Sequence, residues 1–359
     1  MSTADTAKAP DVIVWDITYA CPLRCSHCYS ESGRRPSRQL APAEMVRVVE
    51  SIITLKPRVV ALSGGEPLLV RGVLTVAEQL VQAGIRLGVN TSGWTLTRPM
   101  AERLADLFRE VLVSLDGATA EVHDRIRGRV GSHERALRTL ALLDSVARER
   151  RQAGQPPLRF GIDAVVVNSN RGQLERFCTD IAPRFPHLSA LSFNAAVPAG
   201  LANRPDFART ELLTWDRLAE LAHPALLARL RALAPSTVEV FTADNLNLGM
   251  FPDRLATGGD QQIMHIEPDG EVRAMPLYEG TVGNLLHEPA DLLWDRARAR
   301  WRDPFVVEAL SAVRTMADWV EATRRLDLRF ASDEVRLLID RRAREAHTAA
   351  GAETQAPSC

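Results

Sequence analysis

Residues 15–29 read Trp15-Asp-Ile-Thr-Tyr-Ala-Cys21-Pro-Leu-Arg-Cys25-Ser-His-Cys28-Tyr29, and the cysteines follow a short apolar run that is typical of a strand. Iron–sulfur clusters are held by thiolates this close together, because one small loop can then wrap one face of the cluster. A cluster that only transfers electrons normally takes four cysteines, and a fourth is missing from this neighbourhood. A metal centre keeps an open coordination position when it binds a substrate directly. The loop therefore predicts a 4Fe–4S cluster with one iron left without a protein ligand.

The spacing Cys-x3-Cys-x2-Cys resembles the signature of the radical S-adenosylmethionine (SAM) enzymes. This resemblance implies one 4Fe–4S cluster on Cys21, Cys25 and Cys28, whose open iron binds the amino and carboxylate groups of SAM. It also implies that one electron cleaves SAM to methionine and a 5′-deoxyadenosyl radical, which takes a hydrogen atom from a substrate. His27 stands where the family usually has an aromatic residue, so we expect it beside the cofactor.

Two simpler interpretations of the loop are a zinc site and a structural thiol cluster. Zinc requires four ligands, and His27 is the available fourth. It is squeezed between Cys25 and Cys28 on the same loop, which disfavours zinc. A non-catalytic electron carrier or sensor is a third alternative.

Length and composition restrict the class of protein. The 359 residues are 46% hydrophobic, enough to bury a large core. The net charge of −1 argues against a nucleic-acid partner. No run approaches the roughly 18 apolar residues of a membrane span, and the N-terminus lacks the apolar core of a signal peptide. We therefore expect no membrane partner and a cytoplasmic protein with reduced thiols.

Strand-like and helix-like segments alternate along the first two thirds of the chain. About six such units predict an α/β fold, a partial (β/α)6 TIM-like barrel with a small C-terminal α+β extension. Radical SAM enzymes of this type have the same partial barrel, so the resemblance implies the same fold. The expected strands are 11–18, 58–63, 85–89, 111–115, 158–167 and 188–193, and the expected helices are 40–56, 72–83, 98–108, 132–150, 172–181 and 211–232.

The pattern changes after residue 234, which suggests a division into segments. The expected segments are a flexible leader (1–10), the core barrel (11–234), a degenerate SPASM- or twitch-like extension (235–300), C-terminal helices (301–342) and a disordered tail (343–359).

The second strand ends in Ser63-Gly64-Gly65-Glu66-Pro67. Two glycines let the backbone approach a ligand closely. Placed one strand after the cysteine loop, the sequence resembles the GGEP motif that binds the amino group of SAM, whereas a simple turn is the plainer alternative. An electron carrier has no use for a SAM pocket, so this motif argues against that class.

Other strand ends carry polar residues that resemble the family pattern. Asn90 ends the third strand at a corner that lies near SAM in relatives, with a polar turn as the alternative. Ser114-Leu115-Asp116-Gly117 resembles the corner of peptide-modifying enzymes in which the serine contacts SAM and the aspartate lies near the substrate or the ribose. Asn168 ends the fifth strand and is expected to flank the adenine or ribose.

An arginine after the fourth strand is expected to pair with the carboxylate of SAM. A guanidinium suits this task because it meets a carboxylate in a bidentate manner. Arg127 fits the family spacing best, and Arg125 is close enough to remain an alternative. A solvated charge at a helix end is the plain interpretation of either.

Residues 263–294 resemble the SPASM extension, which normally supplies cysteines for auxiliary clusters. Met275 stands where a cysteine is expected, and no cysteine lies between Cys178 and Cys359. Clusters need thiolates, so we predict no auxiliary cluster. Cys178 lies on a core-facing helical stripe and is expected to be buried, while Cys359 has no expected role except, as an alternative, hydrogen-atom donation.

The N-terminal half resembles the peptide-maturing branch of the family, including mycofactocin-type maturases, and the run 31–35 adds to this resemblance. It favours a ribosomally made precursor peptide as substrate. A small natural-product intermediate such as a sugar or nucleoside is the alternative, because a single cluster makes decarboxylation, epimerisation or rearrangement easier to accommodate than oxidative cross-linking. We expect an external electron donor such as flavodoxin or ferredoxin. No general acid or base is assigned, because the substrate pose decides that role.

Overall fold

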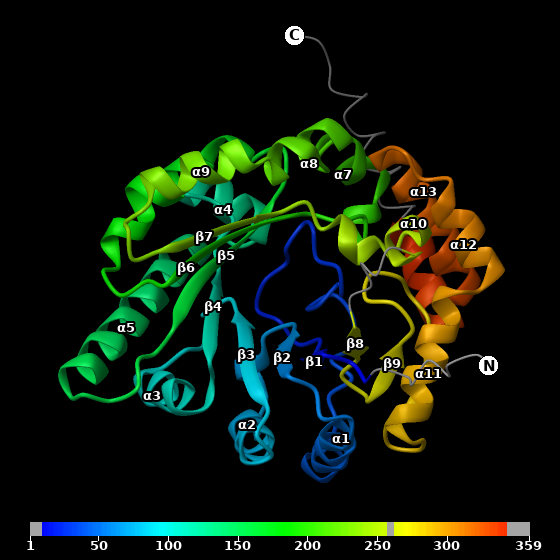
Figure 1. The fold of residues 1–359 in the computed structure, drawn as a ribbon, viewed down its shortest axis with the longest axis horizontal. Helices are drawn as coiled ribbons and strands as arrows, with labels where there is room; N and C mark the ends of the chain where they lie inside the picture. Colours follow the sequence, from blue (N-terminus) through cyan, green and yellow to red (C-terminus); the bar gives the residue numbers. More distant parts are fainter. Residues whose placement is uncertain (1–8, 257–261, 343–359) are drawn as a thin grey trace, which may run out of the picture.

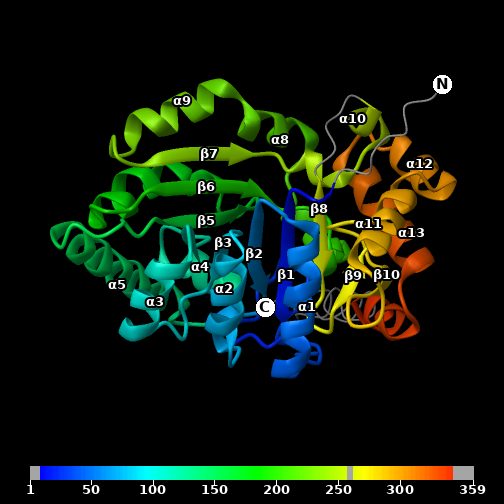
Figure 2. The ribbon, with the colours of Figure 1, turned by 60° about the horizontal axis from the view of Figure 1, so that its bottom comes forward.

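The computed structural model describes residues 9–256 and 262–342. One sheet of ten strands organises the chain, in the order β10-β9-β8-β1-β2-β3-β4-β5-β6-β7. The strands from β8 through β1 to β7 run parallel, and β9 and β10 are antiparallel additions at one edge. The sheet curves into an open arc with helices on its outer side (Figures 1 and 2).

The strands are β1 (Val12–Thr18), β2 (Val59–Gly64), β3 (Arg86–Thr91), β4 (Glu110–Ser114), β5 (Phe160–Val166), β6 (Ala190–Ala195), β7 (Glu239–Ala243), β8 (Ile263–Ile266), β9 (Glu271–Arg273) and β10 (Thr281–Asn284). The main helices are α1 (Pro42–Leu55), α2 (Val73–Gln82), α3 (Arg98–Leu107), α4 (Ala120–Arg127), α5 (Ser132–Gln152), α6 (Leu174–Arg176), α7 (Pro205–Thr210), α8 (Trp215–Ala222), α9 (Pro224–Leu233), α10 (Pro252–Ala256), α11 (Ala290–Trp301), α12 (Pro304–Ser311) and α13 (Met316–Phe330). Short tight turns η1 (Pro67–Leu69), η2 (Arg171–Gln173) and η5 (Gly200–Asn203) follow strands.

The partial barrel is confirmed, and all six expected strands lie in it. Strands β7 and β8 come from the expected extension, yet β7 pairs with β6 and β8 pairs with β1. The barrel sheet therefore continues past the expected boundary at residue 234. Residues 1–8 of the expected leader (1–10) and the whole expected tail (343–359) lie outside the described part of the chain.

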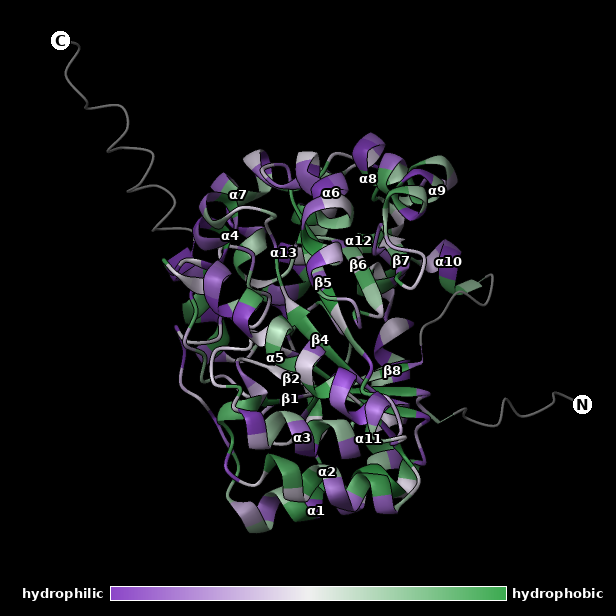
Figure 3. Cartoon of the chain, turned by 90° about the vertical axis from the view of Figure 1, so that its left-hand side faces the viewer, coloured by the Kyte–Doolittle hydropathy of each residue, from purple (hydrophilic) through white to green (hydrophobic). Residues whose placement is uncertain are grey.

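Helices pack on the convex side of the sheet through apolar stripes, visible as green segments in Figure 3. Helix α1, for example, buries Met45, Val48 and Ile52 at helical spacing. Burying each such side chain stabilises the fold by about 1.5–3 kcal/mol. No helix in the described ranges is both long and apolar enough to cross a membrane.

Two of the helices expected between 172 and 232 are divided in the structure. The segment 172–181 forms the turn η2, the short helix α6 and a π-helical turn over Phe177–Ile181. The segment 211–232 becomes α8 and α9, because Pro224 lacks an N–H and disfavours helical geometry in the residue before it. Within the expected C-terminal helices (301–342), the segment after Pro304 forms α12 and α13, and the Thr315 side chain accepts from the Asp318 amide at the start of the second. Cys178 is fully buried, as predicted.

Candidate active site

The cysteine loop lies inside the concave side of the sheet, drawn in dark blue near the centre of Figure 1. Backbone hydrogen bonds hold it from three directions. The Glu66 amide donates to Ala20 O at 2.9 Å, from the end of β2. The Arg24 amide donates to Arg127 O at 3.0 Å, and the Leu201 amide of η5 donates to Cys28 O at 3.0 Å. The loop is thus fixed over the carboxyl ends of the strands, where barrel enzymes place their sites.

Two glycines make this close packing possible. A Cβ on Gly65 would lie 2.2 Å from Ala20 O, and a Cβ on Gly200, which has φ +55°, would lie 2.1 Å from Tyr29 O. The Gly65 amide also donates to Thr18 O at 2.6 Å. The glycines of the Gly-Gly-Glu motif therefore bring the backbone against the cysteine loop, a structural role that was not predicted.

The three thiols are partly or fully buried, and burial affects the ionisation of Cys21 and Cys25. Burial raises the pKa of Cys21 to about 12, and the neighbouring Cys25 and Cys28 add to the effect. Burial likewise raises the pKa of Cys25 to about 11, although the Arg127 charge opposes it. Cys21 and Cys25 are therefore protonated thiols, and a bound cationic metal would ionise them, because metal ligands must be thiolates. Such a set fits an iron–sulfur cluster.

Among the described residues, no three His, Cys, Asp or Glu side chains meet at a point suited to a single metal ion. The Nε2 of His27 lies 2.9 Å from Oδ2 of Asp116, so this nitrogen is engaged by a carboxylate. The zinc interpretation, which needed His27 as its fourth ligand, gains no support from this geometry.

Asp116 is fully buried and is bonded to three separate segments of the site. Its carboxylate accepts from His27, from Arg127 Nη2 at 2.9 Å and from the Val165 amide at 2.9 Å. Burial tends to raise the pKa of Asp116, but the charges of Arg127 and His27 outweigh it and hold that pKa well below its usual range. Asp116 is therefore a fixed negative charge beside the cysteine loop.

Arg127 is buried and points into the site, whereas Arg125 is exposed on the same helix. The Arg127 Nη1 lies 3.7 Å from the Cys25 Sγ, and its Nε lies 2.6 Å from Oδ2 of Asp116. Of the two arginines, only Arg127 reaches the cysteine loop. Its guanidinium, however, is paired with protein groups.

Glu66 is fully buried and holds the end of β3. Its carboxylate accepts from Thr91 Oγ1 at 2.7 Å, from the Ser92 amide at 2.8 Å and from the Ser92 hydroxyl. Burial raises the pKa of Glu66 in spite of these bonds. The side chain therefore acts on neighbouring strand ends, and its predicted contact with SAM stays a prediction, as does that of Gly64 and Gly65.

Strand register brings several polar residues onto the concave face. Asp16 pairs with Ser63, and Ser114 pairs with Asp163, which in turn pairs with Ser192. Asn90 pairs with Leu112, two residues before Ser114, so it shares this face. Asn90 is exposed and Ser114 is half-buried. Both lie where a ligand in the concavity would meet them.

Asn168 is not brought together with the other predicted residues. Its Nδ2 donates to Thr210 O at 2.8 Å and to Leu212 O at 3.1 Å, so it fixes the segment before α8. Asn170, which the sequence reasoning missed, is the residue that reaches the site. Its Nδ2 donates to Asp116 O and Val165 O, both at 2.8 Å. The sequence shows two asparagines, Asn168 and Asn170, after the fifth strand, but it does not tell which of them reaches the site.

Two further carboxylates of the concavity were missed, the half-buried Asp163 and the fully buried Asp16. Asp163 accepts from Asn194 Nδ2 at 2.6 Å, and burial raises the pKa of Asp163 to about 6. Asp16 accepts from the Tyr29 hydroxyl at 2.6 Å and lies 3.0 Å from Nε2 of His265 on β8. The sequence feature that could have indicated both is an acidic residue within an otherwise apolar strand. No sequence feature indicates His265, because its approach to Asp16 depends on the β8–β1 pairing.

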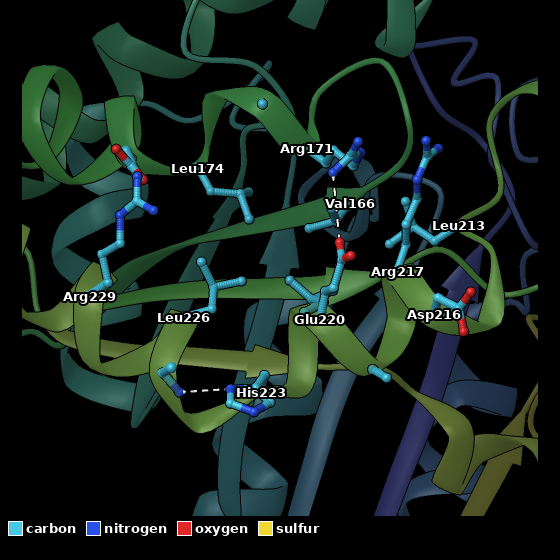
Figure 4. Close-up of a pocket in the computed structure, with 15 residues that line it drawn as sticks. Val166, Arg171, Leu174, Leu213, Asp216, Arg217, Glu220, His223, Leu226 and Arg229 are labelled. Carbon is cyan, nitrogen blue, oxygen red and sulfur yellow. Dashed lines mark hydrogen bonds and ion pairs between the residues drawn. The ribbon is translucent and has the colours of Figure 1, made fainter.

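A cavity of about 750 Å³ lies elsewhere, between the η2–α6 segment and helices α8 and α9. Figure 4 shows Arg171 and Glu220 facing each other across it, 3.9 Å apart. Val166, which lines it, is on the opposite face of β5 from Asp163 and Val165. None of the predicted site residues lines this cavity.

Met275, at the position where the family has a cysteine for an auxiliary cluster, is part of the hydrophobic core. Met275 is 1% exposed and packs in the main hydrophobic cluster. Beside it, Arg273 pairs with Glu267 at 2.8 Å and with Glu279 at 3.1 Å, all three buried. Cys359 lies outside the described residues.

The sequence is similar to known proteins that belong to one superfamily. The profile of the radical SAM superfamily matches residues 15–149. The mycofactocin maturase MftC of Mycobacterium ulcerans is 33% identical over 305 residues, which cover 80% of this chain and 75% of that protein. The chain belongs to the radical SAM superfamily. Family membership implies an iron–sulfur cluster and SAM as cofactors of this enzyme.

This radical SAM chain matches other curated relatives over shorter regions. MftC of Mycobacterium tuberculosis is 33% identical over 178 residues, which cover 49% of this chain and 43% of that protein. The match thus spans less than half of that relative's length. An AdoMet-dependent heme synthase of Methanosarcina barkeri is 36% identical over 138 residues, which cover 38% of this chain and 40% of that protein.

Solved structures show the same fold at low sequence identity. Streptococcus suis SuiB bound to precursor peptide SuiA superposes with a TM-score of 0.60 at 13% identity, covering 86% of this chain and 68% of SuiB. The enzyme anSMEcpe with bound AdoMet gives 0.54 at 17% identity, covering 81% and 82%. The likeness extends over both the barrel and the region after it.

Proposed function

We propose that this radical SAM enzyme modifies a ribosomally made peptide, using one 4Fe–4S cluster held by Cys21, Cys25 and Cys28. The observation that carries the proposal is the placement of these thiols beside Asp116 at the carboxyl edge of the parallel strands. When bound, the cluster and SAM supply one-electron cleavage chemistry that lets a carbon radical take a hydrogen atom from a substrate. An external protein such as flavodoxin or ferredoxin supplies the electron.

The residues of the chain bind and orient. The backbone bonds from Glu66, Arg127 and Leu201 hold the cysteine loop rigid. The polar concave face, with Asn90, Ser114 and Asp163 at neighbouring strand ends, offers hydrogen-bonding groups to SAM and to a substrate. The names of the relatives support a peptide as substrate, since one is a mycofactocin maturase and SuiB binds a precursor peptide.

A small-molecule substrate is the second candidate, and the match to an AdoMet-dependent heme synthase favours it. The two candidates require different molecules to stimulate the reaction. The strand ends described above do not distinguish them, because both a peptide and a small polar intermediate present hydrogen-bonding groups.

The test measures 5′-deoxyadenosine formed by the anaerobically reconstituted protein with dithionite and SAM. Cys25→Ala serves as the control without a complete cluster site. The reaction is repeated with a low-mass extract of the source organism, before and after digestion by a protease. Stimulation that is lost on digestion supports the peptide, and stimulation that survives supports the small molecule. No 5′-deoxyadenosine from the wild type under any condition overturns the proposed function.

A further inference from the structure

We propose that Arg127 acts through Cys25 to set the electron affinity of the cluster, instead of binding the carboxylate of SAM as the sequence suggested. The inference rests on the proposed function, since it requires a cluster on Cys25. It assigns to Arg127 the role of a positioning residue, one that acts through a ligand of the cluster.

The contacts of the guanidinium carry this inference. Nε and Nη2 of Arg127 lie 2.6 and 2.9 Å from the two oxygens of Asp116, and Nη1 lies 3.7 Å from the Cys25 Sγ. Nη2 donates a hydrogen bond to Asp116, and Nε meets the same carboxylate as a close ion pair without hydrogen-bond geometry. The edge of Arg127 that would receive the carboxylate of a ligand is therefore occupied by Asp116.

Asp116 is not free to leave this pairing. Its oxygens also accept from His27 Nε2 at 2.9 Å and from the Val165 amide at 2.9 Å. Its backbone is held on both sides, because the Asp116 amide donates to His123 Nδ1 and its carbonyl accepts from Asn170 Nδ2. Releasing Arg127 to a ligand would leave a fully buried carboxylate with less compensation, which is costly.

The same arrangement directs positive charge at a cluster ligand. Hydrogen bonds to the sulfurs and the charge around an iron–sulfur cluster set its reduction potential. The Arg127 side chain is only 10% exposed, so solvent screens its charge weakly. A cation near Cys25 stabilises the reduced, more negative cluster. Removing the cation must therefore make the cluster harder to reduce.

The test is a potentiometric titration of the reconstituted protein without SAM, followed by electron paramagnetic resonance. Dithionite supplies the single electron taken up, and the comparison is between wild type, Arg127→Gln and Arg127→Lys. Arg127→Gln should bind the electron at least tenfold less well, which corresponds to a midpoint about 59 mV more negative for a one-electron couple. Arg127→Lys keeps the charge but not the planar fork, so its midpoint should lie between the two.

Arg125→Gln is the matched control, because Arg125 is exposed on the same helix, and its midpoint should equal that of the wild type. If Arg127→Gln fails to hold a cluster, Arg127→Lys decides the question alone. Unchanged midpoints, together with weaker SAM binding measured by equilibrium dialysis, overturn the inference and restore the carboxylate-binding role. A wild type that binds no iron instead overturns the proposed function, so the two failures are distinguishable.

Discussion

Glu31 and Arg342 are 311 positions apart in the sequence, yet the Nε of Arg342 donates to the Oε1 of Glu31 at 2.6 Å inside the protein. Arg342 also lies 3.6 Å from Glu279, which Arg273 connects to Glu267. Every one of these side chains is less than a tenth exposed. The segment that follows the cysteine loop is thus tied by buried charges to the C-terminal part of the chain.

Replacing Arg342 with methionine should lower the free energy of unfolding by about 3–5 kcal/mol. The reason is that removing one partner of a buried pair leaves the other charge uncompensated. Urea unfolding at pH 7 measures the loss. Arg325→Met is the matched control, because Arg325 pairs with Glu308 at the exposed surface and such pairs contribute about 0–1 kcal/mol. Equal losses in the two variants would show that the Glu31 pair is not a specific tie.

Gly65→Ala should abolish cluster loading. An added Cβ would lie 2.2 Å from Ala20 O, immediately before Cys21, and backbone atoms cannot yield as a side chain does. Iron content after anaerobic reconstitution is the measurement. Gly88→Ala on β3 is the control, since a Cβ there meets nothing within 4 Å. Normal iron content in Gly65→Ala would contradict the role assigned to this contact.

Asp163 should make stability depend on pH between about 4 and 6. Its pKa is raised by burial from 3.8 to about 6, so the folded state favours the protonated form. The resulting stabilisation is complete below pH 3.8 and is lost as pH rises to 6. Asp163→Asn lacks this loss, so the variant should gain stability relative to the wild type across that window and hold the gain above it. Urea unfolding at each half unit of pH follows the difference.

Other charged groups face Asp163, namely Asp116, Arg127 and His27. The series is repeated in a His27→Gln background, so that a change at His27 cannot account for the difference. Asp180→Asn is a further control. Hydrogen bonds from Thr179 and Arg176 lower the pKa of Asp180, so Asp180 changes stability only below about pH 4. The stability difference between Asp180→Asn and the wild type should therefore be constant between pH 4 and 6. A flat difference for Asp163→Asn as well would refute the assignment.

Met275→Ala should cost about 2–5 kcal/mol of unfolding free energy while leaving iron content unchanged. The side chain is 1% exposed, and its removal leaves a cavity in the core. Thermal or urea unfolding gives the first quantity and iron analysis the second. Lower iron in this variant would mean that the region after β8 supports a cluster, contrary to the buried apolar packing seen there.

Local pattern was enough to predict the cysteine loop and the six strands, whereas the family resemblance placed Asp116 near the substrate or the ribose and did not predict its contacts beside the loop. The loop and the strands each depend on residues close in sequence. Of the two candidate arginines, only Arg127 is buried toward the loop, and its predicted role at the SAM carboxylate stays a prediction.

The unpredicted features depend on contacts between distant segments. The β8–β1 pairing brings His265 to Asp16, 249 positions away, and no periodicity in either segment encodes that meeting. Asn168 and Asn170 follow the same strand, and only the turn at η2 decides which one reaches Asp116. The pairing of Arg127 with Asp116 was not predicted. The sequence motif suggests which ligand group Arg127 could bind, but it does not show that a protein carboxylate occupies the same guanidinium.

Iron and sulfide analysis after anaerobic reconstitution tests the central claim most directly. The wild type should hold about four irons and four sulfides per chain, as one 4Fe–4S cluster requires. The variant Cys21→Ala/Cys25→Ala/Cys28→Ala should hold none. About eight irons in the wild type, or iron retained by the triple variant, would contradict a single cluster on the N-terminal loop.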